Sequence, residues 1–395
     1  MRIFHSMGHV VGGALLIAGT AIGVGMLALP VVTGPSGFVP SITLYFLCWL
    51  FMLATALLLV EVSLWLPPGS GFISIAEKLL GTPGKILFWF VYLFLFVTVM
   101  TAHVDGGGAI VHQVLGWNPL VATLLYVLAI VPVVYLGTQT VDRINMILIS
   151  GVILSYLAFV GFAAPHVDSA LLGYRDWGKA WMALPVLFTA FTFQVIIPTL
   201  ISYLKRDVRK IRMAVIAGST IPLVIYLVWE YVILGVIPPE HLIEAARSGQ
   251  NAVAPLRHYV TSPLLYQVGN AFAFFALTCS FVPLALSFFD FLADGLHLKK
   301  TGWNRLFLVG VVFGIPTGIA FFYPSIFLVA LGYAGGVSCA ILFGVMPPLL
   351  AWIGRYRLGE PCSTWQLPGG KWALGALMAG GLAILVAELA TQLGF

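Results

Sequence analysis

The chain has 395 residues, a length that would suffice for roughly two or three soluble domains. Apolar residues make up 61% of it and charged residues 8%, against roughly 45–50% and about 25% in ordinary globular domains. This composition excludes a soluble protein, a disordered chain, a coiled coil, a disulfide-rich secreted domain and a nucleic-acid binder, and it predicts an all-α polytopic membrane protein in a lipid bilayer.

A membrane-spanning helix needs about 20 apolar residues. Eleven stretches meet this requirement, and we number them as spans 1 to 11. They cover residues 9–33, 39–65, 86–114, 119–138, 144–164, 180–204, 213–236, 264–292, 304–323, 325–353 and 373–393. The first is as long as a complete span and has no small-residue cleavage motif, so we expect it to be retained.

The basic residues predict the orientation, because Lys and Arg favour cytoplasmic loops. With the N-terminus inside, 15 of them lie inside and 4 outside, which accounts for all 19. The outside set is Arg175, Lys179, Arg247 and Arg257. The reverse orientation would invert this ratio, so we expect a cytoplasmic N-terminus and an external C-terminus.

Two connections are longer than tight turns. Residues 70–80 alternate apolar and polar side chains at helical spacing, which predicts a short interfacial helix on the cytoplasmic side. Residues 238–259 form the longest external segment, and either an amphipathic lid or a solvated loop fits its pattern.

Span 1 carries glycines in the middle of the membrane, Gly19, Gly23 and Gly25, with Thr20 among them. A helix broken here would expose N–H and C=O groups, which cost several kcal/mol each in hydrocarbon unless they line a cavity or bind a ligand. The N–H groups near Gly23 and Gly25 would favour a carboxylate, and the carbonyls from Ala18 to Thr20 an ammonium. The alternative is an unbroken helix with a GxxxG-like packing face.

Span 6 offers a second break, since Pro185 and Pro198 flank a polar centre. That centre consists of Thr189, Thr192 and Gln194, which lie among Phe188, Phe191 and Phe193. A kinked helix with an aromatic packing face is the alternative.

Breaks in spans 1 and 6 occupy corresponding positions if spans 1–5 and 6–10 are inverted repeats, and such a pair marks the binding site of a secondary transporter. We therefore predict 11 transmembrane helices in one transporter domain over residues 1–395, a 5+5 inverted repeat with discontinuous helices 1 and 6 plus one extra helix. The repeats cover about 9–164 and 180–353, and the extra helix about 373–393.

Acidic residues inside spans are costly and usually functional. Asp105, in span 3, is a candidate for proton coupling or for binding the substrate ammonium, and a solvated position near the external surface is the alternative. We expect His103 to pack or to meet solvent. Glu61 and Glu230 lie near span ends, where a structural role is expected.

No motif for catalysis or ATP binding is present: the chain has no P-loop and no HExxH, CxxC or GxSxG sequence. The four cysteines lack metal spacing. We therefore expect no enzyme activity, no cofactor and no metal.

Several segments resemble the hydroxy and aromatic amino acid permeases, in particular the tyrosine- and tryptophan-specific ones. They are GGALLIAGTAIGVGMLALP in span 1, then LLLVEV, ISIAEKLLGTPGK, FQVIIPTLISYL and FFDFLAD, in the expected order. The resemblance covers nearly the whole chain, and the family is similar to the amino acid–polyamine–organocation superfamily.

The resemblance implies proton symport of an aromatic amino acid (tyrosine, tryptophan or phenylalanine) across a bacterial-type cytoplasmic (inner) membrane by alternating access. The partners would be the amino acid, the proton and the bilayer. Substrate would bind to the backbone around Ala18, Gly19, Thr20, Gly23 and Gly25, and Phe191, Thr192, Phe193 and Gln194 would line the side-chain pocket.

The chain departs from the family at two places. It has Thr192-Phe193-Gln194 where the family tends to have Gly-Phe-His, and His103-Val104-Asp105 where it tends to have Tyr-Ile-Ser. These changes leave open a same-fold transporter of another small amino acid or solute, including a sodium-coupled one.

Overall fold

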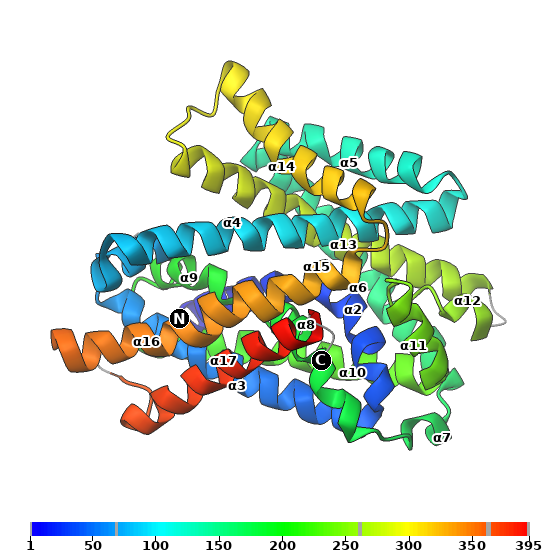
Figure 1. The fold of residues 1–395 in the computed structure, drawn as a ribbon, viewed down its shortest axis with the longest axis horizontal. Helices are drawn as coiled ribbons and strands as arrows, with labels where there is room; N and C mark the ends of the chain where they lie inside the picture. Colours follow the sequence, from blue (N-terminus) through cyan, green and yellow to red (C-terminus); the bar gives the residue numbers. More distant parts are fainter. Residues whose placement is uncertain (1, 68–69, 260–262, 361–364, 393–395) are drawn as a thin grey trace.

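The computed structural model describes residues 2–67, 70–259, 263–360 and 365–392. In this part of the chain all regular elements are helical, so the predicted all-α polytopic membrane fold is confirmed (Figure 1). Ten helices are long and apolar enough to cross a membrane, and a bent helix pair over His9–Ser36 raises the number of spans to 11.

Among the first five spans, span 1 is a pair of helices and the others are single helices. Span 1 consists of α1 (Arg2–Ala21) and α2 (Val24–Thr33), followed by the short helix η1 (Gly34–Ser36). Spans 2 to 5 are α3 (Phe38–Leu64), α4 (Phe72–Leu115), α5 (Pro119–Leu136) and α6 (Thr138–Ala163). The short helices η2 (Ala164–His166) and α7 (Ser169–Leu172) lead to span 6.

Span 6 is made of four short pieces, η3 (Trp177–Ala183), α8 (Leu184–Ala190), η4 (Gln194–Ile196) and α9 (Ile197–Tyr203). Spans 7 to 9 are α10 (Val208–Val236), α13 (Pro263–Gly295) and α14 (Gly302–Phe322), with α11 (Pro239–Arg247) and α12 (Leu256–Tyr259) between the first two. Span 10 contains α15 (Phe327–Tyr333), the π-helix η5 (Ala334–Val345), α16 (Met346–Ile353) and η6 (Gly354–Leu358), and span 11 is α17 (Gly370–Gln392).

Local sequence signals set several helix ends. Gly116 has a left-handed backbone (φ 68°) and ends α4, since glycine adopts this conformation without steric cost. The Asn118 side chain accepts a hydrogen bond from Leu120 N, and Pro119 occupies the first helical position of α5. Gly137 (φ 95°) separates α5 from α6. These ends turn the chain back on itself between spans 3 and 5.

The connections divide the molecule into two ends. The basic end carries the connections with Lys78, Lys85, Arg143, Arg206, Lys300 and Arg355, and the opposite end carries α7, α11 and α12. In Figure 1 the helices α9 and α16 lie at the left, and α7, α11 and α12 lie at the right. The long helices run between these two ends, so the membrane normal is approximately horizontal in this view.

The short helix predicted over residues 70–80 is present as the first part of α4. The backbone of Gly81 is non-helical (φ 71°, ψ −164°), and it separates this part from the membrane span. Phe72 and Ile75 are buried, and the ring of Phe72 stacks on Tyr92 with 6.1 Å between centroids. The apolar face of the helix therefore packs on the protein.

The segment after span 7 is an amphipathic lid rather than a solvated loop. The α11 side chain Leu242 is fully buried and contacts the backbone at Gly34. Beyond α11, Ala252 N donates a hydrogen bond of 2.9 Å to Leu27 O of α2, and Ala252 and Val253 are fully buried. This lid covers the second half of span 1 at the opposite end.

Candidate functional site

Span 1 is broken between α1 and α2, and its two halves are inclined by 57°. The last bond of α1 runs from Ile22 N to Ala18 O (3.0 Å), and the first of α2 from Met26 N to Gly23 O (3.1 Å). Because the first N–H groups of a helix have no partner within it, Val24 and Gly25 present theirs at the break. The predicted interruption is confirmed, and it lies directly after Ala21.

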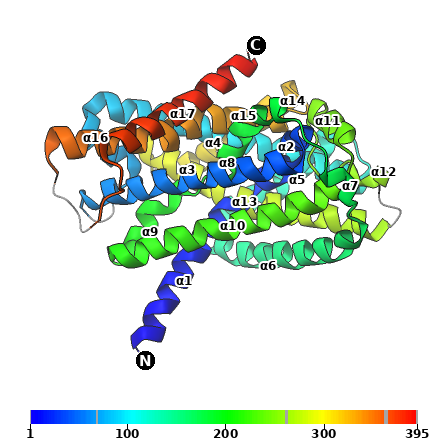
Figure 2. The same cartoon turned by 90° about the horizontal axis from the view of Figure 1, so that it is seen from below.

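Glycine at the break allows close packing as well as unwinding. A Cβ atom on Gly23 would lie 2.7 Å from Ser280 Cβ of α13, and one on Gly25 would lie 2.7 Å from Ala190 Cα of α8. By contrast, a Cβ atom on Gly19 would have no neighbouring atom within 4 Å. Figure 2 shows α1 leaving the bundle at a steep angle to the other spans. The break thus contacts spans 6 and 8, while the α1 side at Gly19 is open.

Span 6 is also broken, since Phe191, Thr192 and Phe193 are non-helical. The side chain of Gln194 stabilises this interruption: its Oε1 accepts a hydrogen bond from Phe193 N (3.0 Å), and its Nε2 donates to Met52 O of α3 (3.2 Å). Gln194 is fully buried. The Gln194 amide therefore fixes the break in span 6 against span 2.

The other predicted pocket residues point to different neighbours. Thr192 Oγ1 donates to Phe188 O (2.6 Å) and lies 3.2 Å from Cys339 Sγ in span 10. Phe191 contacts Tyr226 of span 7, with 5.2 Å between ring centroids. Phe191 and Phe193 are both 1% exposed. The break in span 6 is thus enclosed by spans 2, 7 and 10.

Tyr226 of α10 joins the two breaks. Its hydroxyl donates to Ala21 O at the end of α1 (2.6 Å) and to Ala190 O at the end of α8 (3.0 Å). Tyr226 is fully buried, so this shared hydrogen satisfies carbonyls that would otherwise lack a partner. Sequence reasoning missed this residue, although a tyrosine in an apolar span needs a partner for its hydroxyl.

His103 is the second residue that sequence reasoning undervalued. As expected it packs, but it does so next to the break. Its Nε2 lies 2.9 Å from Ser280 Oγ, the side chain that faces Gly23, and its Nδ1 lies 2.7 Å from Val99 O. The imidazole also stacks on Phe281 at 5.4 Å. Span 3 thus presents a titratable ring to the region around the span 1 break.

Asp105 lies elsewhere. Its Oδ2 accepts a hydrogen bond of 3.0 Å from Phe327 N, the first residue of α15. Residues two apart do not share a helix face, so Asp105 and His103 point to different neighbours. The structure places this carboxyl at the start of span 10.

Span 10 packs directly on the broken span 6. A Cβ atom on Gly335 would lie 1.7 Å from Pro185 O, and Thr189 Oγ1 donates to Leu331 O (2.8 Å). The contact region belongs to η5, and π-helical segments are frequent at functional sites. The pair Gly335-Gly336 was the available sequence signal for this close approach.

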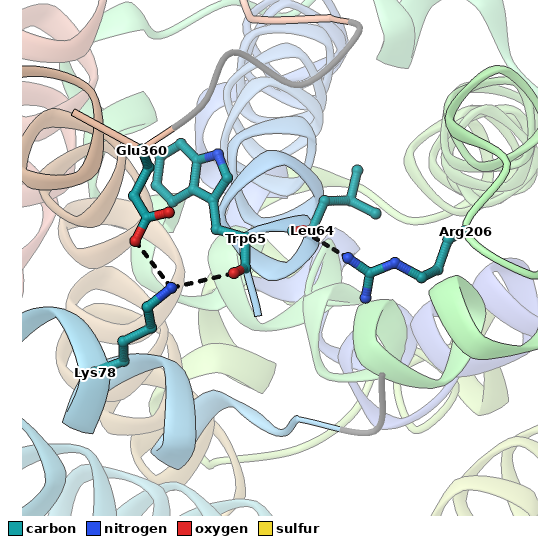
Figure 3. Close-up of polar contacts among 5 residues, drawn as sticks. All are labelled: Leu64, Trp65, Lys78, Arg206 and Glu360. Atoms are coloured by element: carbon teal, nitrogen blue, oxygen red, sulfur yellow. Dashed lines mark hydrogen bonds and ion pairs between the residues drawn. The ribbon is translucent and has the colours of Figure 1, made fainter. Parts of the chain in front are cut away.

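Polar contacts hold the basic end of α3 (Figure 3). Lys78 Nζ donates to Trp65 O (3.1 Å) and pairs with Glu360 (2.9 Å). Arg206 donates to Leu64 O (2.5 Å) and to Leu66 O (2.9 Å). Cationic groups stabilise the carbonyl end of a helix. These contacts tie the connections before span 3 and after spans 6 and 10 to the end of span 2.

Two cavities have linings that include no residue of either break. One of about 980 Å³ is bounded by α4, α5, α6 and α13, and includes Gln113, Tyr126 and Asn270 in its lining. Another of about 260 Å³ lies at the basic end and is lined by residues such as Ser63, Pro198 and Arg206. Within the described ranges, no group of three or more His, Cys, Asp or Glu side chains is placed to bind a metal ion.

Known proteins resemble this chain over nearly its whole length. Residues 7–388 match the model of the tryptophan/tyrosine permease family. The chain is 30% identical to a tryptophan-specific transport protein of Pseudomonas aeruginosa, over 97% of this chain and 95% of the relative. It is also 30% identical to tyrosine-specific transport system 2 of Haemophilus influenzae, over 97% of both chains. A tryptophan-specific transport protein of Haemophilus influenzae is 28% identical, over 98% of this chain and 97% of the relative.

Proposed function

Because this chain belongs to the tryptophan/tyrosine permease family, we propose that it imports an aromatic amino acid by proton symport and alternating access. Tyrosine, tryptophan and phenylalanine are the candidate substrates, and the names of the relatives favour the first two. The family consists of permeases, which confirms that the chain is a transporter and not an enzyme.

One observation carries the proposal: spans 1 and 6 are both broken, and Tyr226 joins the two breaks. The start of α2 directs unpaired N–H groups and the positive end of its helix dipole at the break, which suits the substrate carboxylate at Gly23 and Gly25. The carbonyls from Ala18 to Thr20 suit the ammonium. A zwitterion would thereby be bound at both charged groups.

The side-chain pocket would lie on the span 6 side, at Phe191, Thr192 and Phe193. Gln194 would act as a positioning residue, since its amide already bonds the backbone of the break and span 2. His103 with Ser280 would form the wall opposite. Binding an aromatic ring there requires the closely packed side chains to move apart, as alternating access demands.

The basic end would face the cytoplasm, with the N-terminus inside and the C-terminus outside, in a bacterial-type inner membrane. The inclined α1 lies toward the basic end, while the lid after α11 covers α2 at the other. This combination corresponds to a conformation that is closed outside and opening inside. The 5+5 inverted repeat stays a prediction, supported by the matching breaks.

A transport assay tests the proposal. Purified protein in liposomes should exchange labelled tyrosine, tryptophan or phenylalanine in counterflow, and should accumulate it when the outside is made acidic. Absence of saturable uptake of any amino acid would contradict the transport function. Uptake that requires sodium at fixed pH would instead identify a sodium-coupled transporter of the same fold.

Asp105 is the proton-coupling residue proposed from the sequence, and its conservative variant tests that role. If Asp105 carries the proton, Asp105→Asn should continue to exchange substrate but lose accumulation driven by the pH gradient. An accumulation ratio equal to the wild type would leave Asp105 with a structural role at the start of α15, where Phe327 N donates to it. The pH gradient and lipid composition must be identical for both proteins.

A further inference from the structure

A buried carboxyl group lies on α10 one helical turn beyond Tyr226, the residue that joins the two breaks. Glu230 of α10 is fully buried, and its hydrogen-bond partners are hydroxyl groups: Thr33 Oγ1 lies 2.5 Å from Oε1, Tyr45 Oη lies 2.6 Å from Oε2, and Ser41 is a third. No ion pair in the described ranges includes Glu230. An ionised carboxylate that is buried in hydrocarbon without a cation is strongly disfavoured.

The hydrogen count at Thr33 is compatible with a neutral carboxyl. The single hydroxyl hydrogen of Thr33 has two neighbouring oxygens, Leu29 O at 2.7 Å and Glu230 Oε1 at 2.5 Å. A carbonyl has no hydrogen to give. Either this hydrogen is shared between the two oxygens, as that of Tyr226 is, or Thr33 donates to Leu29 O alone and a protonated Glu230 donates to Thr33.

Glu61 provides the contrast within the same chain. It is as deeply buried as Glu230, with 1% against 0% exposure. Arg355 donates to both of its carboxylate oxygens, at 2.7 Å and 2.5 Å. One buried glutamate is thus compensated as an anion, and the other has surroundings that suit the neutral acid.

In the part of the chain that the structure describes, no charged side chain is bonded to Glu230. The helices packed against α10 are α1, α2, α3, α6, α7 and η2. On or next to these helices, Tyr45 of α3 bonds Glu230 itself, Tyr156 of α6 donates to Ile225 O, and Asp168 and His166 bond backbone atoms of their own segments. Tyr226 on α10 itself is bonded to the breaks, and His9 of α1 contacts Tyr203 at the basic end.

Glu230 is connected to both breaks. It follows Tyr226 by four residues, so the two side chains share one face of α10. Thr33 is the last residue of α2, the second half of span 1. Tyr45 contacts Phe191 of the span 6 break, with 6.2 Å between ring centroids. Any movement of α2 relative to α10 therefore changes the groups that stabilise the carboxyl.

We propose that Glu230 is a second proton-binding residue, which is protonated while α2 is packed against α10 and releases its proton when α2 moves and water enters. Release forms the carboxylate and transfers the proton to water. This inference rests on the proposed proton-coupled transport and adds to it a site that the movement of span 1 itself controls.

Glu230→Gln tests the proposal, because glutamine keeps the shape of the neutral acid but cannot release a proton. Wild-type protein should accumulate substrate up to roughly tenfold per proton for a pH difference of one unit. We expect the variant to lose this accumulation while it still exchanges substrate in counterflow. Accumulation equal to the wild type would overturn the role of Glu230. A wild type without counterflow would instead overturn the transport function.

Infrared spectroscopy gives a second readout that does not depend on Glu230→Gln folding. Thr33→Val keeps the carboxyl and removes one hydrogen-bond partner, so the carbonyl stretch of the protonated acid should move to higher frequency. Glu61→Gln is the control, and it should leave this band in place. A spectrum without a protonated-carboxyl band that responds to Thr33→Val would overturn the proposal.

Discussion

Glu61→Ala should destabilise the protein by about 3–5 kcal/mol, because it leaves the guanidinium of Arg355 buried without its counter-ion. The side chains of this pair are 0% and 5% exposed, and two hydrogen bonds join them. The pair connects span 2 to the last turns of span 10. Reversible unfolding in mixed detergent micelles would measure the free-energy difference.

The pair Asp290–Lys300 supplies a matched control. Its atoms are also close, at 2.7 Å, but its side chains are 44% and 42% exposed. Exposed ion pairs contribute about 0–1 kcal/mol, so Asp290→Ala should have a small effect. The double variant Glu61→Leu with Arg355→Met should recover most of the stability, since it removes both charges. Equal effects of Glu61→Ala and Asp290→Ala would contradict the importance of burial.

Gly25→Ala is expected to impair transport severely. The added methyl would lie 2.7 Å from Ala190 Cα, a backbone atom that cannot rotate away. Overpacking of this kind costs about 1–3 kcal/mol, equal to a roughly 5- to 150-fold change in an equilibrium. The added methyl would separate the span 1 break from the span 6 break, and these two breaks together form the proposed substrate site. Initial rates of counterflow at equal protein density would measure the loss.

Gly310→Ala is the control for Gly25→Ala. Gly310 lies in α14, and a Cβ atom there would meet no atom within 4 Å. This variant should transport at a rate close to the wild type. If both variants behave alike, the close contact between spans 1 and 6 is not needed for transport.

The fold could be predicted because the residues that determine it form local patterns in the sequence. Long apolar stretches, the glycines of span 1 and the prolines of span 6 indicated the spans and both breaks. In each case the signal is local: a helix interior that lacks side chains or backbone donors loses its regular winding. The lid and the helix before Gly81 were likewise suggested by amphipathic spacing.

The roles of single side chains were harder to predict, because they depend on which helices become neighbours. Asp105 contacts the start of α15, 222 residues further along the chain. Nothing near Glu230 in the sequence indicates that Thr33 and Tyr45 surround it, at separations of 197 and 185 residues. The contact of the Gln194 amide with span 2 was hard to predict for the same reason, because it depends on which helices become neighbours.

The most direct measurement is a structure of the protein with bound tryptophan or tyrosine. The account predicts the substrate carboxylate within hydrogen-bond distance of the N–H groups of Gly23 to Gly25, its ammonium at the carbonyls from Ala18 to Thr20, and its ring beside Phe191 to Phe193. Substrate bound only in the cavity between α4, α5, α6 and α13, with both breaks unoccupied, would contradict it.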